Sequence, residues 1–175
     1  MVIAYRDIKP GDEITASYSG PHTLASDRAT RISILKAAHH FTCICRICAH
    51  PHPDSDTNRA RLGALLKKWE EASIDAIVAN PAVSLSDTSE AARLAETENV
   101  TQALIYIYLI EFYVHAAWGA EAAREAAQNA LRSLAKIRGW EAARKHYVAG
   151  WAEDPASYES WGILKAAPKR KYWRA

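Results

Sequence analysis

The stretch "LIYIYLIEFYVHAAW", residues 104–118, is the most apolar part of the chain and decides its fold class. Asn99 and Gln102 stand just before it with the three-residue spacing of a helix cap, and Gly119 follows it as a typical helix terminator. This arrangement predicts one strongly apolar helix between them. Its uncharged run "ALIYIYLI" (103–110) is far shorter than the roughly 20 residues that span a bilayer. We therefore interpret the stretch as the core of a helical lobe.

The rest of the second half is also predicted to be helical. An apolar face shared by Leu62, Leu66 and Ile77 predicts one helix from about residue 58 to Asn80-Pro81. The helix–glycine–helix unit at 104–134 has small residues where its two antiparallel helices would meet, which makes it similar to a single tetratricopeptide hairpin. The further expected elements are a helix capped by Asp87 and Glu90, helices at about 120–138 and 141–151, and a last turn capped by Asp154-Pro155.

The first part of the chain has a different pattern. "VIAY" and "EITASY" are predicted strands around the Pro-Gly turn of "KPGDE", and a helix is expected from about Ser26 to His40, with Asp27 near its start. Arg28 and Arg31 on that helix are expected on a solvated face or in ion pairs. "HPHPDSD" (50–56) is a predicted linker. We therefore expect two units, residues 1–57 and residues 58–175.

Composition limits the function classes. Of 175 residues, 49% are hydrophobic and 24% charged, which is typical of a globular protein with a core. A net charge of +2 gives no case for nucleic-acid binding, and the first residues lack the pattern of a signal peptide. An intracellular protein, nuclear or cytoplasmic, is expected. The basic run "PKRKYWR" (168–174) is interpreted as a solvated tail, with a nuclear import address as the alternative.

All three cysteines lie within "FTCICRIC" (41–48). The spacing Cys-x-Cys-x-x-Cys lets one short loop present three thiolates to Zn²⁺, which prefers tetrahedral sulfur and imidazole ligands. The alternative is that Cys43, Cys45 and Cys48 pack as small hydrophobic side chains. A fourth zinc ligand can be water, a neighbouring molecule, or His50 or His52, although linker roles are favoured for both histidines.

Together these segments resemble the last third of a SET domain running into its post-SET cysteines, most closely that of SET-and-MYND-type and related fungal proteins. "AYRDIKPGDEITASY" (4–18), the helix with Arg31 and Leu35, and "FTCICRIC" stand in the family's order and spacing. The helical region is loosely similar to the C-terminal lobe of those proteins. The resemblance implies a mainly α chain: a small SET/post-SET β remnant with a metal loop, followed by a tetratricopeptide-like helical bundle.

The resemblance also implies an activity. SET enzymes transfer a methyl group from S-adenosylmethionine to a lysine amine of a histone or another protein. Tyr18 matches the tyrosine beside the transferring methyl group, and Phe41 matches the aromatic residue that stacks on the cofactor adenine. Cys43, Cys45 and Cys48 match the three post-SET zinc ligands.

Two family motifs are missing from this sequence: the Gly-x-Gly segment that binds the cofactor, and the Asn-His-Ser-Cys-x-Pro-Asn motif with the fourth zinc cysteine. The chain is therefore expected to be the C-terminal portion of a protein-lysine methyltransferase and to be inactive in isolation. Zinc is the expected cofactor, and S-adenosylmethionine only where the missing segment is present. The alternative function is a non-enzymatic zinc-and-helix protein-interaction module.

Overall fold

The structure is a computed structural model that describes residues 9–11 and 19–165. The mainly α fold class is confirmed, since helices dominate this part of the chain. The two expected strands, 2–5 and 13–18, lie outside the described residues. The helices are α1 (Pro21–Leu24), α2 (Arg28–His39), α3 (Arg46–Ala49), α4 (Ser55–Glu71), α5 (Ile74–Ala79), α6 (Pro81–Thr97), α7 (Thr101–Ala117), α8 (Ala122–Arg138), α9 (Trp140–Arg144) and α10 (Tyr147–Glu153), followed by a 3₁₀ turn at Pro155–Ser157.

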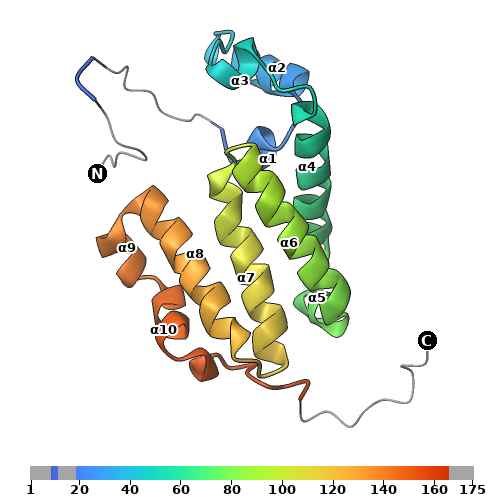
Figure 1. The fold of residues 1–175 in the computed structure, drawn as a ribbon, viewed down its shortest axis with the longest axis vertical. Helices are drawn as coiled ribbons and strands as arrows, with labels where there is room; N and C mark the ends of the chain where they lie inside the picture. Colours follow the sequence, from blue (N-terminus) through green and yellow to red (C-terminus); the bar gives the residue numbers. More distant parts are fainter. Residues whose placement is uncertain (1–8, 12–18, 166–175) are drawn as a thin grey trace.

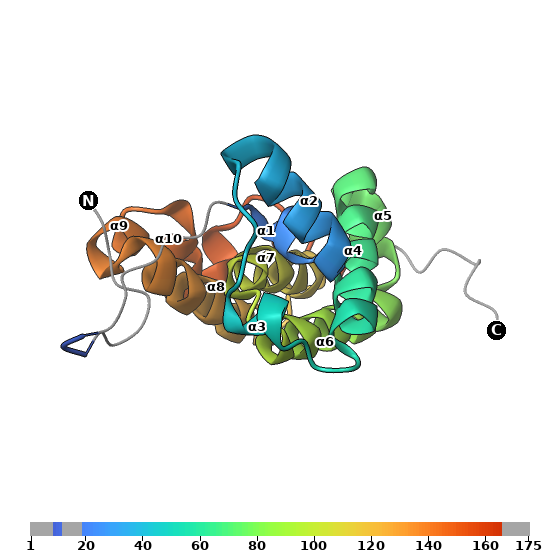
Figure 2. The same cartoon turned by 90° about the horizontal axis from the view of Figure 1, so that it is seen from above.

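Helix α7 is the centre of the molecule. It lies between α6 and α8, with α4 and α5 outside α6 and with α9 and α10 outside α8 (Figure 1). Helices α1, α2 and α3 gather near the first turns of α4, as the view from above also shows (Figure 2). None of the helices in the described part of the chain is both long and apolar enough to cross a membrane.

Two apolar clusters account for most of the core. The larger joins α4, α5, α6 and α7 around Leu62, Leu94 and Ile107. The smaller surrounds Phe112, whose fully buried ring stacks on Trp151 of α10 with centroids 4.7 Å apart. Small side chains let α7 and α8 approach closely, as the sequence predicted for this pair: Ala116 and Ala117 on α7, and Ala123, Ala126, Ala127 and Ala130 on α8, are all buried.

Several predicted helix boundaries are confirmed. Asp27 caps α2 by accepting a hydrogen bond from the Thr30 backbone N–H at 2.9 Å. Gly119 follows α7 with φ of +61°, a left-handed conformation in which glycine carries no steric penalty. Asp154 caps the last turn through the Ala156 backbone N–H at 3.2 Å.

Other boundaries were predicted wrongly. The helix expected from 58 to 80 is interrupted at Ala72, because the Ser73 side chain accepts a hydrogen bond from the Ala76 backbone N–H and starts α5. The helix assigned to Asp87 begins at Pro81 instead, since proline suits a first helical position. Asp87 then lies within α6 and pairs with Lys68 at 2.5 Å.

Two more corrections concern the later helices. The expected helix at 141–151 is split at His146, whose Nδ1 accepts a hydrogen bond from the Val148 N–H and opens α10. The cap expected from Asn99 is also wrong. Val100 is the N-cap of α7 and makes no side-chain cap, while Asn99 adopts a left-handed φ of +55°.

The turn between α1 and α2 packs directly on α4. Ala25 in that turn is buried in the larger apolar cluster. Gly63 permits the approach, because a Cβ at this position would lie 3.2 Å from the Ala25 carbonyl oxygen. The first helices are therefore joined to the helical lobe by close packing as well as by the chain.

Candidate metal centre

The three cysteines converge on one point of the structure. His40 ends α2 in a left-handed conformation, with φ of 59°, and redirects the chain into the cysteine loop. The Cys45 carbonyl then accepts hydrogen bonds from the Cys48 and Ala49 backbone N–H groups at 2.9 and 2.8 Å, which forms the single turn of α3. As a result, the Sγ atoms of Cys43, Cys45 and Cys48 lie within 4.8 Å of one another.

This geometry could hold a metal ion. Four ligands at the usual Zn–S distance of about 2.3 Å place neighbouring sulfurs about 3.8 Å apart, so only a small contraction of the cluster is needed. Within residues 9–11 and 19–165 it is the single group of three or more histidine, cysteine or acidic side chains that meets so closely. Cys48 is buried, Cys43 half-buried and Cys45 exposed, so the open side faces solvent.

The thiols affect one another's ionisation. Burial disfavours the Cys45 thiolate, but hydrogen bonds from the Cys48 backbone and from the two other thiols outweigh it and lower the pKa of Cys45. Burial and the neighbouring Cys45 and Cys43 raise the pKa of Cys48 to about 11. Three sulfurs this close cannot all ionise by themselves, whereas a divalent cation would replace their protons.

The histidines after the loop do not join the cluster. His50 and His52 are exposed, and neither belongs to the group of converging ligand atoms. His52 Nδ1 instead lies 3.8 Å from an Asp54 carboxylate oxygen and accepts a hydrogen bond from the Asp54 backbone N–H at 3.3 Å. The prediction that His50 and His52 are linker residues agrees with their position outside the cluster.

Of the two residues matched to cofactor binding and methyl transfer, the structure describes one. Tyr18 lies outside the described residues. Phe41 begins the cysteine loop, is 39% exposed, and has its ring centroid 6.4 Å from that of His39. Its expected role in stacking on a cofactor stays a prediction.

Sequence reasoning missed the polar residues that support the cluster. The exposed Arg28 side chain donates from Nε to the Cys48 carbonyl at 2.6 Å, and the Arg28 backbone N–H donates to Asp56 at 2.7 Å. Arg31 was expected on a solvated face or in an ion pair, but it is only 5% exposed and donates a hydrogen bond to the Ser26 carbonyl. The spacing of Arg28, Arg31 and Leu35 was a usable signal, because these positions share one helix face.

A second polar group lies at the start of α4. The buried Arg59 donates from Nε to a Glu98 carboxylate oxygen at 3.0 Å. Glu98 also accepts hydrogen bonds from Ser55 at 2.6 Å and from Asn58 at 3.1 Å. Ser55 and Arg59 fall four residues apart on the stripe that continues to Leu62 and Leu66, so their burial was visible in the helical spacing.

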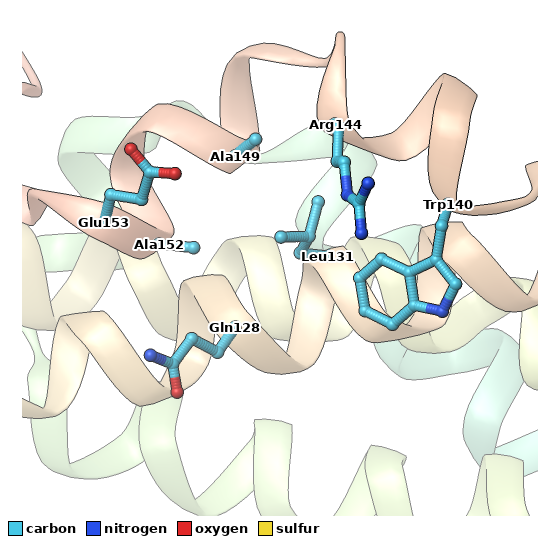
Figure 3. A pocket seen from close by; sticks show the side chains of 7 residues that line it. All are labelled: Gln128, Leu131, Trp140, Arg144, Ala149, Ala152 and Glu153. Carbon is cyan, nitrogen blue, oxygen red and sulfur yellow. The ribbon is translucent and has the colours of Figure 1, made fainter.

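A separate hollow of about 400 Å³ lies between α8, α9 and α10. Trp140 and Arg144 border one side, Glu153 the other, and Leu131 lies between them (Figure 3). It is formed by elements on the far side of α7 from the cysteine cluster (Figure 1). No residue that the sequence singled out contributes to it.

Comparisons with known protein-family models, with curated proteins and with solved structures give no significant match for this chain. The site must therefore be interpreted from its own residues and geometry.

Proposed function

We propose that this chain is the C-terminal part of a SET-domain protein-lysine methyltransferase, in which residues 41–48 form the post-SET zinc site and the following helices a tetratricopeptide-like lobe. One observation supports the proposal above all. The three cysteines of the Phe-x-Cys-x-Cys-x-x-Cys run meet at one point, directly after a helix that carries Arg31 and Leu35. A loop that packed cysteines only as small hydrophobic side chains would not need all three sulfurs within one ligand sphere.

In this proposal Cys43, Cys45 and Cys48 would hold zinc, which would fix the loop and stabilise it without taking part in the reaction. Phe41, two residues before the first ligand, would then be held in place to stack on the adenine of S-adenosylmethionine. Tyr18 would orient the lysine amine and the methyl donor for in-line transfer. The protein substrate would be a histone or another nuclear or cytoplasmic protein.

The chain alone is expected neither to bind S-adenosylmethionine with useful affinity nor to methylate lysine. Tyr18 and Phe41 could form only one side of a cofactor pocket, and a small ligand needs most of its surface enclosed to bind well. Calorimetric titration of the purified chain measures this directly. A micromolar dissociation constant would contradict the expectation.

The metal part of the proposal is tested by elemental analysis of protein purified under reducing conditions without chelators. We expect about one zinc per chain, bound more weakly than in a four-cysteine site because the loop supplies only three ligands. Cys48→Ser should abolish stoichiometric binding. The double replacement His50→Ala and His52→Ala is the matched control and should leave the affinity unchanged. Wild-type protein without zinc would overturn the metal site.

The methyltransferase part is tested on the transcript and its product. We expect the reading frame to extend upstream of Met1 and to encode the Gly-x-Gly and Asn-His-Ser-Cys-x-Pro-Asn motifs. The encoded protein should transfer a radiolabelled methyl group from S-adenosylmethionine to a protein lysine. Tyr18→Phe should reduce the turnover much more than the thermal stability. An upstream sequence without these motifs would contradict the assignment.

A second candidate is a non-enzymatic protein-interaction module, and one observation favours it. Apolar side chains are exposed around the metal loop: Ile34 at 40%, Phe41 at 39% and Ile44 at 84%. Large apolar side chains exposed near one loop are a feature of protein-binding surfaces. The transcript experiment separates the two functions, because the module does not need the upstream motifs.

A further inference from the structure

Two buried arginines meet at the turn between α1 and α2. Arg31 reaches in from α2 and donates from Nη1 to the Ser26 carbonyl, while Arg59 reaches in from α4 and donates from Nη1 to the Leu24 carbonyl. These carbonyls flank the buried Ala25, so the guanidinium groups approach the same short turn from two helices. Their side chains are 5% and 3% exposed, respectively.

Only one of the two positive charges has a buried acidic partner in the described structure. Arg59 is paired with Glu98, through its Nε at 3.0 Å and through a second bond from Nη2 to the Glu98 backbone carbonyl at 2.7 Å. Arg31 has no acidic partner among the described residues, and its Nη2 is buried there without a hydrogen-bond partner. Burying a charge without a counter-charge is costly, so an excess of positive charge at this position needs an explanation.

The cysteine cluster lies close to this excess charge. Arg28, one helical turn before Arg31 on the same face of α2, donates to the Cys48 carbonyl at 2.6 Å. Cys48 is itself buried. The electrostatic influences on Arg59 agree with this proximity: burial and the Arg31 charge lower the pKa of Arg59, while Glu98 and Cys48 act in the opposite direction.

The charges then balance. In this chain, a Zn²⁺ ion bound by three thiolates and a neutral fourth ligand such as water carries a net charge of −1, and the group of Arg31, Arg59 and Glu98 carries a net charge of +1. We propose that Arg31 is the buried counter-charge of the metal centre, a positioning residue that stabilises the zinc-thiolate complex through its fixed positive charge without contacting the metal. The proposal builds on the zinc site proposed above.

The test compares zinc affinities of the whole chain, measured by competition with a chromophoric chelator under reducing conditions. Arg31→Met removes the charge but keeps a long side chain, and it should weaken zinc binding at least about 10-fold, since the effect of a single charge in a buried, poorly screened site is of this order. Arg31→Lys should restore most of the affinity. Arg61→Met removes an exposed arginine of α4 that pairs with Glu90, and should change the affinity less than about 2-fold.

A variant of opposite sign separates charge from scaffolding. Glu98→Gln removes the buried negative charge and should tighten zinc binding, although it destabilises the fold. If Arg31 and Glu98 acted only as structural supports, both replacements would weaken binding. Circular dichroism at the titration temperature shows which variants are folded. If Glu98→Gln does not fold, the comparison of Arg31→Met with Arg31→Lys decides the proposal.

Three outcomes would overturn the inference alone: wild-type affinity in Arg31→Met, equal losses in Arg31→Met and Arg31→Lys, or weaker zinc binding by folded Glu98→Gln. A wild-type chain that binds no zinc would instead defeat the proposed metal site, and the inference with it.

Discussion

The N-terminal segment, residues 19–54, and the helical bundle, residues 55–165, are stabilised by different interactions. In the segment, the buried residues are Ala25, Arg31, Leu35 and Cys48, of which one is charged and one a candidate metal ligand. The bundle buries three apolar clusters made of leucine, isoleucine, valine, phenylalanine and many alanines. Apolar burial therefore maintains the bundle, whereas the segment buries few side chains and relies on specific polar contacts around a cysteine cluster that could hold a metal ion.

This difference has a thermodynamic consequence. The stabilisation from apolar burial is roughly proportional to the buried area and is spread over many residues. A bundle of this kind therefore tolerates the loss of any one exposed contact. Buried charges and metal ligands act in sets, and a set that loses one member leaves the others unsatisfied. Changes in the segment are expected to be local and metal-dependent, and changes in the bundle to be global.

The largest effect should come from the centre of the bundle. Phe112→Ala removes a fully buried ring that stacks on Trp151, and should lower the free energy of unfolding by about 3–5 kcal/mol. Tyr106→Ala on the same helix, 57% exposed, is the control and should cost no more than about 0.5 kcal/mol. Denaturant unfolding measures both. Equal midpoints for the two variants would remove the contrast between core and surface on which the comparison depends.

An intermediate effect is expected when the two regions are separated. A fragment of residues 55–175 should still unfold cooperatively, but with a stability reduced by about 1–3 kcal/mol, because Arg59 loses the Leu24 carbonyl as a buried acceptor. A fragment starting at residue 58, the boundary expected from the sequence, should be less stable again, since it also lacks the Ser55 hydroxyl that binds Glu98. Thermal circular dichroism compares them. Absence of any cooperative transition in the longer fragment would show that the segment is essential to the bundle.

The smallest expected effect concerns pH. Burial lowers the pKa of His115 on α7, although the Glu125 charge partly opposes this. The folded chain therefore binds this proton less readily than the unfolded chain, so the contribution of His115 to stability is present above about pH 6.5 and is lost as the pH falls below it. His146 shifts in the same direction, through burial and Arg138.

His115→Gln isolates the first of these contributions. The variant should lose less stability than the wild type between pH 7.5 and pH 5.5, in urea unfolding at each pH. Glu111, whose pKa is raised by burial and by Glu125, contributes with the opposite sign. Glu111 is present in both proteins, so the comparison of the two is directed at His115. Identical pH slopes for the two proteins would show that His115 is not a source of the bundle's acid sensitivity.

Local sequence signals determined much of the architecture. The apolar run 104–118, Gly119 after it and the alanine-rich helix that follows fixed the central hairpin, because helical periodicity and terminators act within a few residues. The same holds for Asp27 at the start of α2 and for the cysteine spacing, which brings three sulfurs together through one short loop. Such features need no information from distant parts of the chain.

The tertiary structure alone decided where the local signals conflicted or were silent. Ser73 and His146 interrupt apolar patterns that otherwise read as continuous, and Pro81 rather than Asp87 begins α6. Arg31 and Arg59 are charged side chains that sequence rules place in solvent, yet they are buried, because α2 and α4 meet at the α1–α2 turn and its carbonyls accept their hydrogen bonds. Helical spacing can indicate that these positions lie on a buried face. The partners that make burial of a charge possible, such as Glu98 for Arg59, come from residues far apart in sequence, and no local pattern identifies them.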